Sequence, residues 1–193
     1  MPEKLILAST SRYRAALLAK LGLPFEQSAP EVDETPLVNE SAEQLVLRLA
    51  IAKAQAVAAT RDHGLVIGSD QVCECDGIIL GKPGNLDGAL AQLKRAQGKS
   101  VIFYTGLCVI NARTQARHAM VEPFTVHFRS LSDEALLRYL NAEQPFDCAG
   151  SFKSEGMGIT LFKALEGRDP NALIGLPLIA LVALLERHGI ALP

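Results

Sequence analysis

The order of apolar runs along the chain constrains the fold more than any single motif does. In the first half, short strand-like runs such as Leu5–Ala8 and Leu65–Gly68 alternate with patterns of helical spacing. Further along, Val101–Ile110 and Ala119–Phe128 are long strand-like runs separated by a short connection, which is typical of an antiparallel pair. The sequence therefore predicts an α/β fold with a mixed, twisted central sheet flanked by helices and a cleft at the strand ends.

Local signals place the helices and one hairpin. Ser41 followed by Gln44 has the spacing of a capping box at the start of a helix. Helical spacing predicts helices at four further places: after Ser11, over 86–96, after Ser132 and over 176–188. Asp76-Gly77 predicts the turn of a hairpin over Val72–Leu80. The loop-rich stretch from Ser151 to Pro177 is the best candidate in the sequence for a mobile flap.

Length and charge narrow the function classes. The chain has 193 residues, which predicts a single domain over 1–193. Lys and Arg number 19 against 21 Asp and Glu, so no strong positive field is present for nucleic acid or an anionic membrane. We expect neither as a partner, and the absence of a long apolar stretch or secretory signal favours the cytoplasm. A monomer and a homodimer are both compatible with the sequence.

Cysteine and histidine spacing disfavours structural zinc. The four cysteines show no Cys-x-x-Cys pair, and the four histidines are scattered without a second ligand at helical spacing. Cys73 and Cys75 lie two positions apart on an expected strand, hence on one face, where buried thiols are the simpler interpretation.

Lys53 is the most informative single residue by pattern. It projects between Val46 and Leu49, inside the apolar stripe of its helix rather than opposite that stripe. A lysine in this position either snorkels to solvent from the edge of the stripe or points into a cleft as a cation for an anionic ligand.

Asp70 lies two positions after Gly68, the last residue of the apolar run Leu65–Gly68, and we expect it at the end of that strand. In open α/β sheets the carboxyl ends of strands form the ligand crevice, which favours a working carboxylate here. The alternative is a turn aspartate that caps the next segment.

Two further clusters carry chemistry compatible with a nucleotide. Asp33 and Glu34 supply hard oxygen ligands that suit Mg²⁺ or Mn²⁺, although a solvated acidic loop fits the same spacing. Ser9 and Arg14 lie at an expected strand-to-helix turn, where hydroxyls, guanidinium groups and free helix amides can cradle phosphate. A simple helix cap with surface arginines is the alternative. Lys82 is either a second phosphate cation or a plain turn lysine.

Taken together, these residues resemble the Maf family of nucleoside-triphosphate pyrophosphatases over most of the chain, from Leu5 to Pro177. The run Leu5–Ser11 with Arg14 resembles the opening signature of that family. Further motifs follow in the family's order: Asp33-Glu34, Lys53-Ala54, Ser69-Asp70, Gly81-Lys82-Pro83, Thr105-Gly106, Ala149-Gly150 and Gly175-Leu176-Pro177.

The resemblance implies a Maf- and ITPase-like fold and hydrolysis of a nucleoside triphosphate to the monophosphate and diphosphate with a divalent cation, Mg²⁺ or Mn²⁺. It implies that Asp70 is the catalytic residue, which activates water for attack on the α-phosphorus. Metal binding falls to Asp33, Glu34 and Asp70, and triphosphate binding to Ser9, Arg14, Lys53 and Lys82.

The resemblance also indicates which nucleotide base the protein recognises. The opening differs from the family's usual Ser-Pro-Arg-Arg at Arg12, Tyr13 and Ala15. Members acting on dTTP and UTP tend to have arginine at the place of Tyr13 and glutamine at that of Glu155. A 7-methylguanine base is positively charged and gains from an aromatic face, while its N1 and N2 hydrogens match a carboxylate.

Ser151–Gly156 and Ser69–Gln71 resemble the branch that cleaves 7-methyl-GTP, which implies that substrate, with Gln71 as a further base or sugar contact. Alternatives stay open: Tyr13 as a partly buried helix residue, Glu155 as a solvated carboxylate, and a dTTP/UTP or broad modified-nucleotide pyrophosphatase. A non-catalytic nucleotide-binding regulator of cell division is the alternative of another class. In each case the expected partner is a small-molecule nucleotide.

Overall fold

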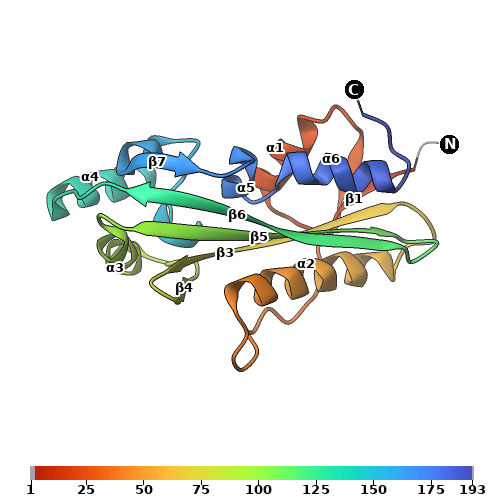
Figure 1. Cartoon of the computed structure of the whole chain (residues 1–193), viewed down its shortest axis with the longest axis horizontal. Coiled ribbons are helices and arrows are strands. Elements are labelled where there is room, and N and C mark those ends of the chain that lie inside the picture. The colour runs from red at the N-terminus through yellow and green to blue at the C-terminus, as the bar shows by residue number, and fades with distance from the viewer. Residues whose placement is uncertain (1–2, 193) are drawn as a thin grey trace. The chain divides into compact units, whose positions relative to one another are not determined.

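The structure is a computed structural model that describes residues 3–192 (Figure 1). Within these residues, one seven-stranded mixed sheet has the order β2-β1-β3-β5-β6-β7, and β4 pairs with β3. The strands are β1 Leu5–Leu7, β2 Phe25–Gln27, β3 Leu65–Cys75, β4 Ile78–Leu80, β5 Ser100–Asn111, β6 Arg117–Phe128 and β7 Phe162–Glu166. The α-helices are α1 Arg12–Ala19, α2 Ala42–Ala58, α3 Leu86–Ala96, α4 Asp133–Glu143, α5 Pro170–Ile174 and α6 Leu178–Arg187. The predicted fold class is confirmed.

The described residues group into two compact units. The first takes in the residues up to Gln71, Thr105–Glu122 and the residues from Asp169 on, and the second takes in Val72–Tyr104 and Pro123–Arg168. Strands β3 and β5 each contribute residues to both units, as does β6.

In the first unit, strand alternation sorts apolar side chains onto two faces. Leu7 and Ile67 belong to a core cluster with residues of α1 and α6, whereas Ile6 and Val66 belong to a second cluster with residues of α2. Figure 1 shows α2 on one side of the strands and α1 and α6 on the other. β1 pairs with β2 and with β3 in parallel.

Two glycines let α2 lie directly against the sheet. A Cβ on Gly68 of β3 would lie 2.2 Å from the Ala50 carbonyl oxygen, and one on Gly106 of β5 would lie 2.1 Å from the Val46 carbonyl oxygen. Because both distances are shorter than van der Waals contact, any larger residue at these positions forces the helix away.

The second unit has an aromatic core. Phe128, Phe152 and Phe162 meet edge to face, with ring centroids 4.7–5.7 Å apart, and Phe103 adds a further contact at 5.3 Å from Phe152. Such edge-to-face pairs are favoured by the ring quadrupole beyond the area that they bury.

Most predicted elements are confirmed. The capping box at Ser41 and Gln44 is present, and α3 occupies the predicted range. Cys73 and Cys75 are buried free thiols, as expected. The β3–β4 hairpin turns at Asp76 and Gly77, both at positive φ, as the Asp-Gly signal predicted.

One prediction needs correction. The strand that begins at Leu65 does not end at Ser69–Gln71 but continues to Cys75, so Asp70 lies inside β3 and not at its end. The loop-rich stretch 151–177 also holds β7, α5 and a 3₁₀ turn at Met157–Leu161. β2 also had no sequence signal strong enough to predict it.

No helix among the described residues is both long and apolar enough to cross a membrane.

Candidate active site

Three polar residues follow one another within β3 where its partner β1 has ended. β1 stops at Leu7, which lies opposite Ile67, and β3 continues through Ser69, Asp70 and Gln71. Successive side chains of a strand point to opposite faces, so Asp70 faces α2 while its two neighbours face the other layer. Beyond the end of β1, β3 therefore carries the carboxylate of Asp70 on one face and the neutral side chains of Ser69 and Gln71 on the other.

On the α2 face, Asp70 is held by Lys53. The Lys53 Nζ donates to Asp70 Oδ1 at 2.7 Å and lies 2.6 Å from Glu34 Oε1. Lys53 and Asp70 are 6 % and 7 % exposed, whereas the Glu34 side chain is 60 % exposed. Lys53 therefore does not snorkel to solvent, and its position in the apolar stripe reflects a buried ion pair, which the close approach of α2 at Gly68 makes possible.

Burial sets the proton affinity of this carboxylate. Desolvation raises the pKa of Asp70 above its ordinary value, and the nearby positive charges of Lys53 and Arg14 oppose that rise. Glu34, a like charge, raises the pKa of Asp70 further. A carboxylate with a raised pKa is a stronger base while it is ionised, which suits proton transfer.

On the opposite face, Gln71 and Thr105 bind backbone carbonyls of α5. Gln71 Nε2 donates to the Ala172 oxygen at 2.7 Å and to the Leu173 oxygen at 3.2 Å. It also donates to Thr105 Oγ1 at 3.1 Å, and this hydroxyl in turn donates to the Ala172 oxygen at 2.9 Å. Neutral hydrogen bonds therefore join β3, β5 and α5.

The carbonyl of Gly175 is a second anchor on this face. The buried Ser69 Oγ donates to it at 2.9 Å, and Arg14 Nε donates to it at 2.9 Å. Gly175 ends α5 with φ +118°, a conformation that other residues rarely adopt. Burial lowers the pKa of Arg14, against the effect of the Asp70 and Glu34 charges, yet the guanidinium is charged at any working pH.

The turn between β1 and α1 is a helix cap in this structure. Ser9 Oγ accepts from the Ser11 amide at 3.1 Å, and Ser11 Oγ accepts from the Arg14 amide at 3.4 Å. Ser9 is buried, at 6 % exposed. The cap is present, but Arg14 is half-buried and bound to Gly175 instead of lying on the surface, and phosphate binding by Ser9 and Arg14 stays a prediction.

Asp33 does not join the ion pair of Lys53. Its side chain accepts from the Thr35 amide at 2.9 Å, and hydrogen bonding to Thr35 lowers the pKa of Asp33. Across residues 3–192 no three Asp, Glu, His or Cys side chains are grouped to hold a metal ion. Metal binding by Asp33, Glu34 and Asp70 stays a prediction.

Tyr13 already has a cation against its ring. The Arg12 guanidinium lies 4.9 Å from the ring centroid, and its Nη2 donates to the Tyr13 hydroxyl at 2.9 Å. Tyr13 is half-buried, which fits the simpler of its two interpretations and leaves its part in base recognition a prediction.

Lys82 and Glu155 belong to the second unit, unlike the other predicted site residues. Both side chains are exposed, and Glu155 Oε2 accepts from Ser154 Oγ at 3.4 Å. Their roles toward the nucleotide stay predictions.

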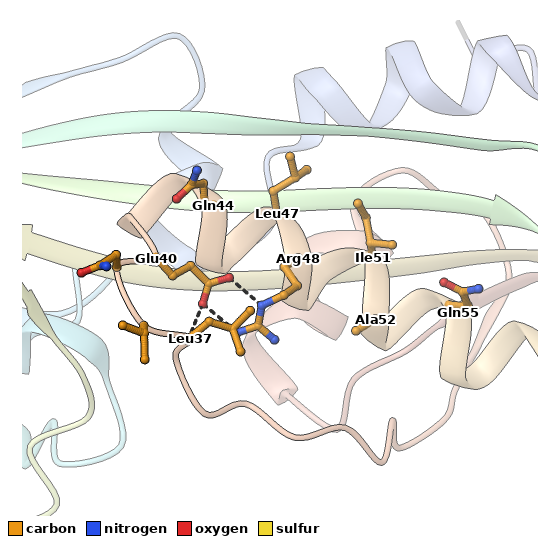
Figure 2. A pocket seen from close by; sticks show the side chains of 10 residues that line it. Leu37, Glu40, Gln44, Leu47, Arg48, Ile51, Ala52 and Gln55 are labelled. Atoms are coloured by element: carbon orange, nitrogen blue, oxygen red, sulfur yellow. Dashed lines mark hydrogen bonds and ion pairs between the residues drawn. The ribbon is translucent and has the colours of Figure 1, made fainter.

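A separate pocket lies on the outer face of α2. It has a volume of about 810 Å³ and is lined by Leu37, Val38, Leu47 and Ile51, together with neighbouring polar residues. Figure 2 shows Arg48 reaching across it to Glu40, with which it forms hydrogen bonds of 2.6 and 2.8 Å. No predicted site residue lines this pocket, because Lys53 occupies the inner stripe of the same helix.

The family model described as "Maf-like protein" matches residues 4–188. The chain belongs to the Maf family. Two curated relatives are both named 7-methyl-GTP pyrophosphatase. The one from Colwellia psychrerythraea is 58% identical over 97% of this chain and 94% of its own length. The one from Pseudoalteromonas atlantica is 58% identical over 97% of this chain and 96% of its own length. The solved structure of the Staphylococcus aureus Ham1 protein, at 13% identity, matches with a TM-score of 0.55 over 96% of this chain and 100% of that one, which shows the fold alone.

Two motifs of this Maf-family chain, Thr105-Gly106 and Gly175-Leu176-Pro177, had no role assigned from the sequence, and the structure shows what their residues contact. Gly106 lets α2 approach the sheet, and the hydroxyl of Thr105 anchors α5. Gly175 supplies the carbonyl that binds Arg14 and Ser69. These contacts join residues far apart in the chain, so the only sequence signal for them was the position of each residue within a family motif.

Proposed function

We propose that this chain hydrolyses 7-methyl-GTP to 7-methyl-GMP and diphosphate. The hydrolytic step rests on one observation, a nearly buried carboxylate, Asp70, paired with a buried lysine, Lys53. The substrate rests on the names of the two relatives that are 58% identical to this chain.

Asp70 is the general base of this proposal. It accepts a proton from water as the water oxygen forms a bond to the α-phosphorus, and the bond from that phosphorus to the bridging oxygen of the β-phosphate breaks. Diphosphate leaves with the electron pair of that bond. The raised pKa of Asp70 supports the role, because burial strengthens the base while the positive charge of Lys53 favours its ionised form.

Cations hold the triphosphate. The Arg14 Nε is committed to the Gly175 carbonyl, which turns the planar guanidinium so that its Nη groups are the donors for phosphate. Lys53 moves from Glu34 toward a phosphate oxygen, since its bond to the exposed Glu34 is the weaker of its two contacts. Ser9 and Lys82 supply further polar contacts.

The carboxylates near Lys53 fit a divalent cation. Glu34 and Asp70 both place an oxygen within 2.7 Å of one ammonium group, and carboxylate oxygens are the ligands that Mg²⁺ and Mn²⁺ prefer. Glu34 and Asp70 would hold the ion, joined by Asp33. When bound, such an ion neutralises charge on the phosphate oxygens.

The base is recognised by Tyr13, Gln71 and Glu155. The aromatic face of Tyr13 suits a positively charged 7-methylguanine, and the ring already carries the cation of Arg12 at 4.9 Å. The carboxylate of Glu155 accepts from the base N1 and N2 hydrogens. We also propose that both units act as one domain over 1–193 and that the protein works in the cytoplasm, which the buried free thiols of Cys73, Cys75 and Cys108 support.

A substrate panel tests the proposal. Purified protein with Mg²⁺ or Mn²⁺ is given 7-methyl-GTP, GTP, dTTP and UTP, and both products are identified. We expect the highest kcat/KM for 7-methyl-GTP, with one diphosphate for each 7-methyl-GMP. A preference for dTTP or UTP would show that 7-methyl-GTP is not the substrate. Nucleotide binding without any diphosphate release would favour a non-catalytic regulator.

A further inference from the structure

The side-chain amide of Gln71 has only one orientation that its surroundings accept. One end of the amide faces the carbonyl oxygens of Ala172 and Leu173, at 2.7 and 3.2 Å. Carbonyl oxygens accept hydrogen bonds and never donate them, so this end must be the NH₂ group. The opposite orientation would place Oε1 against both oxygens with no proton between them.

Thr105 adds a third acceptor at the same end of the Gln71 amide. Its side chain is fully buried at 0 % exposed, and its Oγ1 lies 2.9 Å from the Ala172 oxygen and 3.1 Å from Gln71 Nε2. The hydroxyl has one proton, which the Ala172 carbonyl takes, so toward Gln71 the hydroxyl can only accept. Three acceptors therefore surround Nε2, and the Oε1 end of the amide is turned away from them.

We propose that Thr105 is a positioning residue for base selection: together with the carbonyls of Ala172 and Leu173 it holds the Gln71 amide so that Gln71 offers the nucleotide an acceptor, Oε1, and withholds its donors. This inference rests on the proposed function, in which Gln71 contacts the base. A guanine-type base presents three hydrogens, one on N1 and two on N2, so one N2 hydrogen is left for this acceptor when Glu155 accepts the other two. A uracil or thymine base has a single ring donor, N3–H, between two acceptors, O2 and O4. These oxygens need donors that the held amide withholds, and rotating the amide to supply one would leave buried groups unpaired.

The proposal predicts different effects for Thr105 and for Ser69. Ser69 is also fully buried and also binds the α5 segment, through the Gly175 carbonyl at 2.9 Å, but its hydrogen bond does not involve Gln71. Ser69→Ala therefore loosens the same segment and leaves the acceptors around Nε2 in place. It is the matched control for Thr105→Val, and Thr105→Ser, which keeps the hydroxyl, is the rescue variant.

The first experiment compares kcat/KM for 7-methyl-GTP and UTP in the wild type and these three variants. Thr105→Val should lower the ratio of 7-methyl-GTP to UTP by about tenfold, the effect of one misdirected hydrogen bond. Thr105→Ser and Ser69→Ala should keep the wild-type ratio. An unchanged ratio in Thr105→Val, or an equal fall in Ser69→Ala, would overturn the inference while leaving the proposed function standing.

The second experiment needs no substrate. In the nucleotide-free protein, NMR hydrogen exchange of the Gln71 side-chain NH₂ should be slow in the wild type, Thr105→Ser and Ser69→Ala, and at least several-fold faster in Thr105→Val. Equal exchange in the wild type and Thr105→Val would contradict the fixed amide even if no nucleotide is turned over. If Thr105→Val exchanges faster than the wild type but neither protein turns over nucleotide, only the proposed function is overturned.

Discussion

The two faces of β3 at Ser69, Asp70 and Gln71 differ in charge and in the kind of partner that each side chain binds. On one face Asp70 is charged, nearly buried and dependent on a single strong partner, Lys53. On the other face Ser69 and Gln71 are neutral and donate to backbone carbonyls of the α5 segment. The charged face therefore carries a carboxylate whose pKa depends on its neighbours. The neutral face fixes the position of the α5 segment on β3.

The difference follows from the cost of burial. A buried carboxylate that loses its partner is destabilising by about 3 kcal/mol or more, whereas the loss of one neutral hydrogen bond costs about 1 kcal/mol. The charged face also contains an exposed member, Glu34, so it can exchange one partner for a ligand without burying a new charge. Four variants test this comparison.

Asp70→Asn should have the largest effect. An amide cannot accept the proton of water, so kcat should fall by at least about a thousandfold while the fold is kept. Steady-state diphosphate release measures the loss, and thermal unfolding checks the fold. Diphosphate release at more than a tenth of the wild-type rate would remove Asp70 from the reaction.

Lys53→Met should reduce kcat by about a hundredfold and destabilise the protein by about 3 kcal/mol at neutral pH, because Asp70 loses its counter-ion. Without Lys53 the pKa of Asp70 rises further, so protonation relieves the strain and the stability deficit shrinks as the pH falls. Urea unfolding at several pH values measures this dependence.

The neutral face supplies the control for that experiment. Ser69→Ala removes an uncharged hydrogen bond, so its stability deficit should stay the same at every pH. If the deficit of Lys53→Met were equally independent of pH, the claim that Lys53 stabilises an ionised Asp70 would be wrong.

Gly68→Ala should disturb the charged face through packing. The added Cβ would lie 2.2 Å from the Ala50 oxygen and 2.7 Å from the Ala54 nitrogen, so α2 must shift away from β3. We expect a loss of about 2 kcal/mol in unfolding free energy and a several-fold lower kcat. Gly81→Ala, whose Cβ would meet no atom within 4 Å, is the control and should leave unfolding unchanged; equal losses would contradict the close approach.

Glu34→Gln should have the smallest effect on stability. Its side chain is exposed, so stability should be nearly unchanged. Removal of a like charge should lower the pKa of Asp70, opposite in sign to Lys53→Met. NMR titration of the Asp70 carboxyl carbon in metal-free protein measures the shift, and an upward shift would contradict the arrangement of the three charges.

The sequence was sufficient for most of the architecture because its signals are local. The capping box at Ser41 and the Asp76-Gly77 turn depend on neighbouring residues alone. Lys53 stood out for the same reason, since an ionised side chain inside an apolar stripe requires a partner.

The continuation of β3 past Gly68 could not be predicted in this way. Ser69-Asp70-Gln71 has the composition of a turn, and it stays in the strand because residues far away in the chain bind each of the three side chains. The role of Thr105 was hidden for the same reason, because its partner Ala172 is distant in sequence. Local patterns carry no information about such partners.

Hydrolysis of 7-methyl-GTP in oxygen-18-labelled water tests most directly whether Asp70 activates water at the α-phosphorus. Mass spectrometry of both products after a single turnover should find the label in 7-methyl-GMP and none in diphosphate, and Asp70→Asn should incorporate no label in the same time. Label in the diphosphate, or equal incorporation by Asp70→Asn, would contradict the mechanism.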